Sequence, residues 1–192
     1  MKVVGLTGGI GSGKSTVSRL LNMMGIPVYI ADTESKRLTE SSSVIREKLT
    51  ERFGADLYAN GKLNKMLLAS LIFKNETDRK YVNSVIHPVV RTEFNRWKTQ
   101  QASSTIVVIE TAIMFETGLA DSVDVSVTVA APEDLRIRRV EIREGWPRAS
   151  IVSRIRSQFS EEEKIRRSDY VIFNDDKQAL IPQVEKLIKT IL

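Results

Sequence analysis

The chain has 192 residues, 42% hydrophobic and 28% charged, so it can bury a core and fits one domain with an inserted subdomain. It has no cysteine, which excludes disulfides and thiolate metal sites and favours the cytoplasm. No apolar stretch approaches the roughly 18 residues of a membrane span, so we expect neither export nor a membrane. The net charge of +5 leaves nucleic acid open, but a polyanionic small substrate explains it at least as well, because no run of aromatics accompanies the basic residues.

Short apolar runs alternate with helical patterns along the chain. From Lys14 to Met24, apolar residues recur at helical spacing, and Gly25 ends the pattern. Compact apolar runs of this kind predict five buried strands, joined mainly through helical sequence, and therefore a parallel sheet with helices on both faces. The strands are expected at residues 2–7, 27–31, 105–109, 123–130 and 170–173.

Two long helical segments interrupt the expected core. Residues 33–104 are too long for one crossover helix, so they predict a helical insertion. Residues 133–168 are helical and rich in arginine, and residues 178–192 form a closing amphipathic helix. The core of this α/β domain is then expected from 1–32, 105–132 and 169–192.

The segment between the first strand and the first helix matches the pattern G-x-x-x-x-G-K-[ST]. Glycines let the backbone N–H groups surround phosphates, and the helix adds the positive end of its dipole. Lys14 is expected to neutralise the β and γ phosphates, and the hydroxyl of Ser15 to bind Mg²⁺. An ordinary glycine-rich turn is the alternative. The sequence thus predicts a P-loop NTPase-type fold whose loop residues are Gly8, Gly9, Gly11, Ser12, Gly13, Lys14, Ser15 and Thr16.

Asp32 follows the second strand, at the edge where open parallel sheets bind their ligands. In a kinase, a carboxylate at this position orients the acceptor hydroxyl, accepts its proton and holds a water on Mg²⁺. The alternative is that Asp32 only caps the following helix.

The basic segment offers pairs of side chains at helical spacing. Arg139 and Arg143 share a face, as do Arg154 and Gln158, which suits a cover that brings cations onto a transferring phosphoryl group. A solvated face paired with glutamates is the alternative. His87 is the only histidine, so it either packs structurally or contacts a substrate.

In their order along the chain, these residues resemble the dephospho-coenzyme A kinase family. The resemblance begins with Gly5 to Thr16 and Ala31-Asp32, and it extends over nearly the whole chain. Its later carriers are Gly61-x-Leu63, Ile72-Phe73, Ile86-His87-Pro88, Met114 to Leu119, Arg139, Arg143, Arg154, Gln158, Asp169 to Ile172 and Asn174.

The resemblance implies transfer of the γ-phosphoryl group of ATP to the ribose 3′-hydroxyl of dephospho-coenzyme A, the last step of coenzyme A synthesis. It implies that Asp32 is the catalytic base, assisted by Lys14 and Arg139, and that residues 133–168 close as a lid. The insertion would help to bind the acceptor, and Asn174 would lie near the adenine. The remaining sites implied are Arg143 for ATP, and His87, Glu116, Arg154 and Gln158 for the acceptor.

Three positions differ from the family's usual pattern. Ile30, Ala112 and Asp176 stand where aspartate, proline and glycine are common. Another P-loop kinase, acting on a nucleoside or a nucleoside monophosphate, is the nearest alternative. A nucleotide-dependent switch protein and a nucleic-acid-binding module are the alternatives of other classes.

Overall fold

The computed structural model describes residues 1–192, apart from the side chain of Lys74. The described chain divides into two compact units, of which the first is discontinuous. It consists of Met1–Ile30 and Gln101–Leu192, and the second unit is Ala31–Gln100.

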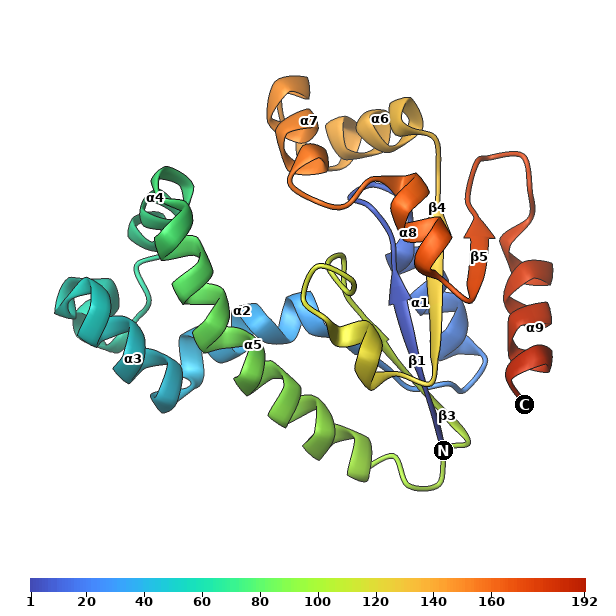
Figure 1. Cartoon of the computed structure of the whole chain (residues 1–192), viewed down its shortest axis with the longest axis horizontal. Helices are drawn as coiled ribbons and strands as arrows, with labels where there is room; N and C mark the ends of the chain where they lie inside the picture. The colour runs from blue at the N-terminus through green and yellow to red at the C-terminus, as the bar shows by residue number, and fades with distance from the viewer. The chain divides into compact units, whose positions relative to one another are not determined.

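A parallel sheet forms the centre of the first unit (Figure 1). Over the described residues it has five strands in the order β2-β3-β1-β4-β5. Strand β1 lies between β3 and β4, with Val4 beside both Val108 and Val125. The expected five-stranded parallel sheet is therefore confirmed. The strands are β1 Lys2–Thr7, β2 Val28–Ile30, β3 Ile106–Glu110, β4 Val125–Ala130 and β5 Tyr170–Phe173.

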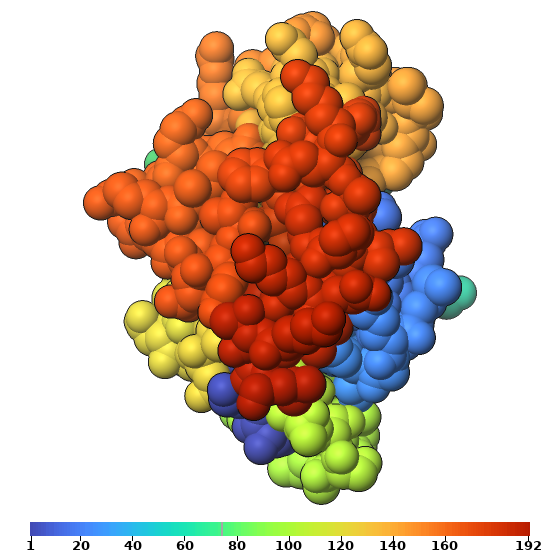
Figure 2. Space-filling model, turned by 90° about the vertical axis from the view of Figure 1, so that its right-hand side faces the viewer, coloured from blue at the N-terminus to red at the C-terminus, as the bar shows by residue number. Residues whose placement is uncertain are grey.

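Two helices from opposite ends of the chain cover one face of this sheet. Helix α1, Lys14–Met23, contributes Val17 to the main core cluster, and α9, Leu180–Ile191, contributes Leu187. The ammonium of Lys2 also donates to the carbonyl of Ile191 at 2.6 Å, so the last helix is joined to the first strand. In Figure 2 the dark red end of the chain lies beside the dark blue N-terminus.

The opposite face of the sheet is covered by α8, Glu161–Arg167. Side chains of β4 alternate between the two faces: Val127 points into the main core, whereas Thr128 bonds to the carbonyl of Lys164 on α8 at 3.4 Å. Helices therefore flank both faces, as the apolar strand runs predict.

Helices α6, Glu133–Glu144, and α7, Arg148–Arg156, form a small core of their own. Its buried residues are Ile137, Val140, Ile151 and Ile155. The partly buried Ile10 of the glycine loop packs against this cluster. The helical prediction for residues 133–168 is thus confirmed, and the segment α6–α7 contacts the loop that follows β1. A short 3₁₀ helix, Leu119–Ser122, lies between β3 and β4.

The second unit is helical, as expected for the insertion. Hydrogen bonds join its helices: the hydroxyl of Tyr58 donates to the carbonyl of Thr39 at 2.7 Å, and that of Tyr81 to the carbonyl of Lys48 at 3.1 Å. Nowhere in the described part of the chain is a helix long and apolar enough to cross a membrane. The helices are α2 Ala31–Ser41, α3 Ser43–Phe53, the 3₁₀ segment Ala55–Gly61, α4 Lys65–Lys74 and α5 Glu76–Thr99.

Candidate active site

The glycine loop connects β1 to α1 in the way its sequence predicts. Gly8, Gly11 and Gly13 have φ angles of 152°, 79° and 95°, a region that glycine enters readily, and Gly13 is the N-cap of α1. The buried Lys14 ammonium donates to the carbonyls of Gly8 at 2.8 Å and Gly9 at 3.3 Å. Ser15, in the first turn of α1, is exposed. The loop thus combines a helix N-terminus, an ammonium and an accessible hydroxyl, which together suit a polyphosphate.

The outer side of the loop is in close contact with α6 and with the segment after β5. A Cβ at Gly9 would collide with the guanidinium of Arg136, and one at Gly11 with the backbone carbonyl of Arg136. A Cβ at Gly13 would collide with the side-chain amide of Asn174, which donates to the carbonyl of Ser12 at 2.8 Å. Protein neighbours therefore require glycine at these three positions.

Arg136 is a residue that the sequence analysis did not select. Its side chain is only 5% exposed and lies 3.6 Å from the carboxylate of Glu161 and 3.8 Å from that of Glu133. Burial raises the pKa of Glu161, while the N–H of Ala131 and the charge of Arg136 act in the opposite direction. The available signal was spacing: Arg136 is four residues before the buried Val140, so it lies on the core-facing side of α6.

Arg139 and Asn174 lie together at the glycine loop. The guanidinium of Arg139 donates to Asn174 Oδ1 at 3.4 Å and to Asp176 Oδ1 at 2.5 Å. Asp176 has a positive φ of 61°, a left-handed conformation that glycine enters readily and aspartate tolerates. Asp176 thus places a carboxylate partner beside Arg139.

The other predicted arginines lie in different surroundings. Arg143 is 58% exposed and pairs with the adjacent Glu144 at 2.7 Å. The guanidinium of Arg154 lies 4.4 Å from the centre of the Trp146 ring, a cation–π contact. Among the described residues of the first unit, Arg139 is the one of these three arginines that donates a hydrogen bond to Asn174, which contacts the loop.

Glu110 is a second residue that the sequence analysis did not select. It ends β3 and lies beside Leu6 of β1, and its buried carboxylate accepts a hydrogen bond from the hydroxyl of Ser18 at 2.5 Å. The sequence signal was an acidic residue at the end of an apolar strand. In P-loop NTPases an acid in this region helps to hold Mg²⁺.

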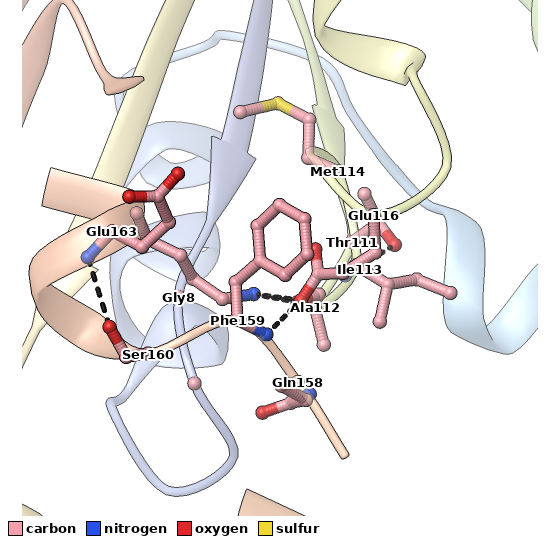
Figure 3. A network of polar contacts seen from close by, with 12 residues as sticks. Gly8, Thr111, Ala112, Ile113, Met114, Glu116, Gln158, Phe159, Ser160 and Glu163 are labelled. Carbon is pink, nitrogen blue, oxygen red and sulfur yellow. Dashed lines mark hydrogen bonds and ion pairs between the residues drawn. The ribbon is translucent and has the colours of Figure 1, made fainter. Parts of the chain in front are cut away.

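Glu116 and Gln158 both have protein partners in the first unit. Glu116 Oε1 accepts hydrogen bonds from the ammonium of Lys164 and from the N–H of Phe159, each at 2.8 Å (Figure 3). Gln158 Oε1 accepts from the N–H of Ile10 at 3.1 Å. Both residues therefore lie in a network of contacts that reaches the glycine loop.

Asp32 and His87 belong to the second unit. Asp32 is the second residue of α2, two residues after β2 ends, and it is exposed. His87 lies inside α5, where burial, with a contribution from Arg91, lowers the pKa of its imidazole. Both effects favour the neutral form of the imidazole.

The oxygen atoms that the structure describes near the glycine loop suit a Mg²⁺ ion that is also bound by phosphates and waters, and they do not form a metal site enclosed by protein ligands alone. Among the described residues there is no group of three or more histidine, cysteine, aspartate or glutamate side chains that could enclose a metal. Mg²⁺ in nucleotide sites keeps several waters and takes one or two protein oxygens together with the phosphates. The hydroxyl of Ser15 and the carboxylate of Glu110 provide oxygens of that kind.

A family model, a curated relative and a solved structure that match this chain are all described as dephospho-CoA kinase. The family model described as dephospho-CoA kinase matches residues 2–179. A dephospho-CoA kinase of Bacteroides fragilis is 46% identical over 185 residues, covering 96% of this chain and 90% of that protein. The crystal structure of TT1252 from Thermus thermophilus has a TM-score of 0.84 at 33% identity, covering 99% of this chain and 95% of that one. Dephospho-CoA kinase from Campylobacter jejuni has a similar fold, with a TM-score of 0.71 at 22% identity over 98% of this chain and 96% of that one.

Proposed function

Since the chain belongs to the dephospho-CoA kinase family, we propose that it phosphorylates the ribose 3′-hydroxyl of dephospho-CoA, using ATP and releasing ADP. The observation that carries this proposal is the glycine loop, whose Gly8 and Gly9 carbonyls bind the ammonium of Lys14. The model of this family matches the chain along most of its length. The loop supports binding of the ATP phosphates, and membership of the family supports dephospho-CoA as the acceptor.

The loop and the start of α1 bind the triphosphate in this proposal. Backbone N–H groups and the α1 dipole face the phosphates, and Lys14 balances charge on the β and γ groups. Ser15, Glu110 and Asp32 would hold Mg²⁺. The bound ion would neutralise the charge that develops on the phosphate oxygens during transfer. The side chain of Thr16, exposed at the same turn, completes the ATP-facing set.

Asp32 acts as the base. Its carboxylate accepts the proton of the acceptor hydroxyl as the oxygen forms a bond to the γ-phosphorus, and the bond from that phosphorus to the β-bridging oxygen breaks. The exposed position of Asp32, two residues after β2 ends, supports this role. A carboxylate that only caps α2 would have no part in the reaction.

Arg139 stabilises the charge on the transferring group, and residues 133–168 exclude water, whose attack on ATP is the competing reaction. The buried Nη1 atom of Arg139 has no hydrogen-bond partner among the described residues, so it has donor capacity for a phosphate. We retain Arg143 and Asn174 on the ATP side. The resemblance implies an acceptor role for His87, Glu116, Arg154 and Gln158; we retain His87 and Arg154 there, whereas the contacts of Glu116 and Gln158 lead to the glycine loop.

The acceptor is tested by supplying Mg-ATP with dephospho-CoA, a nucleoside or a nucleoside monophosphate and measuring ADP release. We expect turnover with dephospho-CoA, and phosphorus NMR should place the new phosphate on the ribose 3′-oxygen. Turnover with a nucleoside monophosphate and none with dephospho-CoA would refute the proposed acceptor. Omission of Mg²⁺ should abolish the activity. The cytoplasmic location is also a proposal, which fractionation of cells expressing the tagged chain tests.

A further inference from the structure

Glu116 lies in a buried network after β3, and its carboxylate has two partners on one oxygen (Figure 3). The side chain of Lys164 is 1% exposed and that of Glu116 is 15% exposed, so the ion pair is largely shielded from water. Lys164 also donates to the carbonyl of Ala112 at 2.6 Å. A shielded pair with added hydrogen bonds holds its geometry firmly, because loss of either partner leaves a charge uncompensated.

The second partner of Glu116 is a backbone group, the N–H of Phe159, at 2.8 Å. Phe159 lies in the segment 157–160, which connects the end of α7 to Ser160, the N-cap of α8. The hydroxyl of Ser160 accepts from the N–H of Glu163 at 3.2 Å, which fixes the start of α8. Phe159 lies between α7 and α8, and its N–H is held by the Glu116 carboxylate in place of a helix carbonyl.

The residue before Phe159 reaches the glycine loop. Gln158 Oε1 accepts from the N–H of Ile10 at 3.1 Å, and the side chain of Ile10 packs against the core cluster of α6 and α7. Because Gln158 and Phe159 are consecutive residues, the hydrogen bond that holds the backbone N–H of Phe159 also restricts the position of Gln158. The contacts therefore form a continuous path from Lys164 and Glu116, through the connection, to the tip of the loop.

We propose that Glu116 is a positioning residue for the ATP site: it holds the 157–160 connection so that Gln158 fixes the phosphate-binding loop at Ile10. The proposal rests on the ATP-binding part of the proposed function and assigns Glu116 and Gln158 to the nucleotide side of the reaction. Acceptor recognition then does not depend on the Glu116 carboxylate. A fixed loop keeps the N–H groups that follow Ile10 in the geometry that phosphate requires.

The first test compares Glu116→Gln, Gln158→Ala and the control Glu163→Gln. The control makes the same chemical change on α8, at a carboxylate whose partners are Arg166 and Arg167. Binding of a nonhydrolysable ATP analogue with Mg²⁺, measured by calorimetry, should weaken about fivefold in Glu116→Gln and in Gln158→Ala, the typical effect of one hydrogen bond. Glu163→Gln should bind as the wild type does.

The double variant supplies the sharper test. Because both residues act through one path, Glu116→Gln should cause little further loss in a Gln158→Ala background. Hydrogen exchange of the loop peptide that contains Ile10 should accelerate in both single variants. In Gln158→Ala, the exchange that reports global unfolding should stay unchanged, whereas Glu116→Gln also leaves Lys164 without its charge partner and should accelerate it. If both kinds of exchange moved together in Gln158→Ala, the loss would be one of general stability and the proposal would be overturned.

The Michaelis constant for dephospho-CoA at saturating ATP separates this role from acceptor binding. We expect it to stay within about twofold of the wild-type value in Glu116→Gln, since only the ATP site is affected. A raised constant for the acceptor with unchanged binding of the ATP analogue would show that Glu116 contacts the acceptor instead. Binding of the analogue needs no acceptor, so a wrong acceptor assignment leaves this test valid. If Glu116→Gln does not fold, Gln158→Ala still decides whether the contact to Ile10 supports ATP binding.

Discussion

Gly9→Ala provides a direct measurement of the contact between the glycine loop and α6. Unlike Gly8 and Gly11, Gly9 is not in a positive-φ conformation, so its backbone is open to alanine. The obstacle is the guanidinium of Arg136, against which the new Cβ would collide. Arg136 is buried and lies beside the carboxylates of Glu161 and Glu133, so it has little freedom to withdraw.

The expected penalty follows from overpacking of a buried contact, which costs about 1–3 kcal/mol. If the loop moves to relieve the collision, this free energy appears as a loss of ATP affinity of about 5–150-fold. The assay is calorimetric binding of a nonhydrolysable ATP analogue with Mg²⁺, accompanied by urea unfolding to detect the share that appears as lost stability.

A double-mutant cycle assigns the penalty to its cause. In an Arg136→Ala background the side-chain collision is gone, so Gly9→Ala should cost much less there. Gly11→Ala is the matched control, because its Cβ meets the backbone carbonyl of residue 136 and its φ is +79°, neither of which Arg136→Ala removes. An equal penalty for Gly9→Ala in both backgrounds would refute the reasoning, as would rescue of Gly11→Ala.

Three further perturbations test the proposed chemistry and one structural contact. Lys14→Ala should abolish measurable phosphoryl transfer in the ADP-release assay, because Lys14 is the residue proposed to neutralise both the β and the γ phosphates; retained turnover would contradict that role. Asp32→Asn should lower kcat by about 10²–10⁴-fold with little change in binding of the ATP analogue, whereas full activity would mean that Asp32 only caps α2. Asp169 accepts hydrogen bonds from the N–H of Ser126 at 2.8 Å and from its hydroxyl at 2.7 Å, which lower the pKa of the carboxyl. Because the pKa of Asp169 is lower in the folded protein than in the unfolded chain, the ionised carboxylate stabilises the fold at pH values above the unfolded pKa. The wild type should therefore be more stable than Asp169→Asn at pH 7, and this difference should decline as the pH falls below about 4. Urea unfolding of both proteins at pH 7 and below about pH 4 checks this, and a difference that does not change with pH would contradict it.

The sheet and the glycine loop could be predicted from sequence because their signals are local. The strands are continuous apolar runs, and the loop is one contiguous motif between the first strand and the first helix. The helical insertion was likewise readable, since α3, α4 and α5 each carry their own periodicity. The resemblance to the family, confirmed by the comparisons, added the acceptor, which no local pattern of residues supplies.

The residues that support the loop are harder to predict. A charged side chain is rarely buried without a partner, and here the partners are far away in the sequence. Arg136 and Lys164 are both almost fully buried, and their partners Glu161 and Glu116 are 25 and 48 residues away in the chain. A sequence pattern treats such residues as solvated. Asp176 is a related case: its positive φ and its contact to Arg139 depend on how the segment after β5 meets α6.

The contact between Lys2 and Ile191 spans 189 positions of the chain, and it has a consequence for biosynthesis. During translation, β1 emerges first, but the face of the sheet that it shares with β3 and β4 can be covered only in part, by α1, until the residues of α9 have left the ribosome. The nascent chain therefore exposes apolar surface for almost the whole of its synthesis, a state that favours chaperone binding and aggregation. A stop codon just before residue 180 would leave the glycine loop intact and still yield a chain unable to close its core.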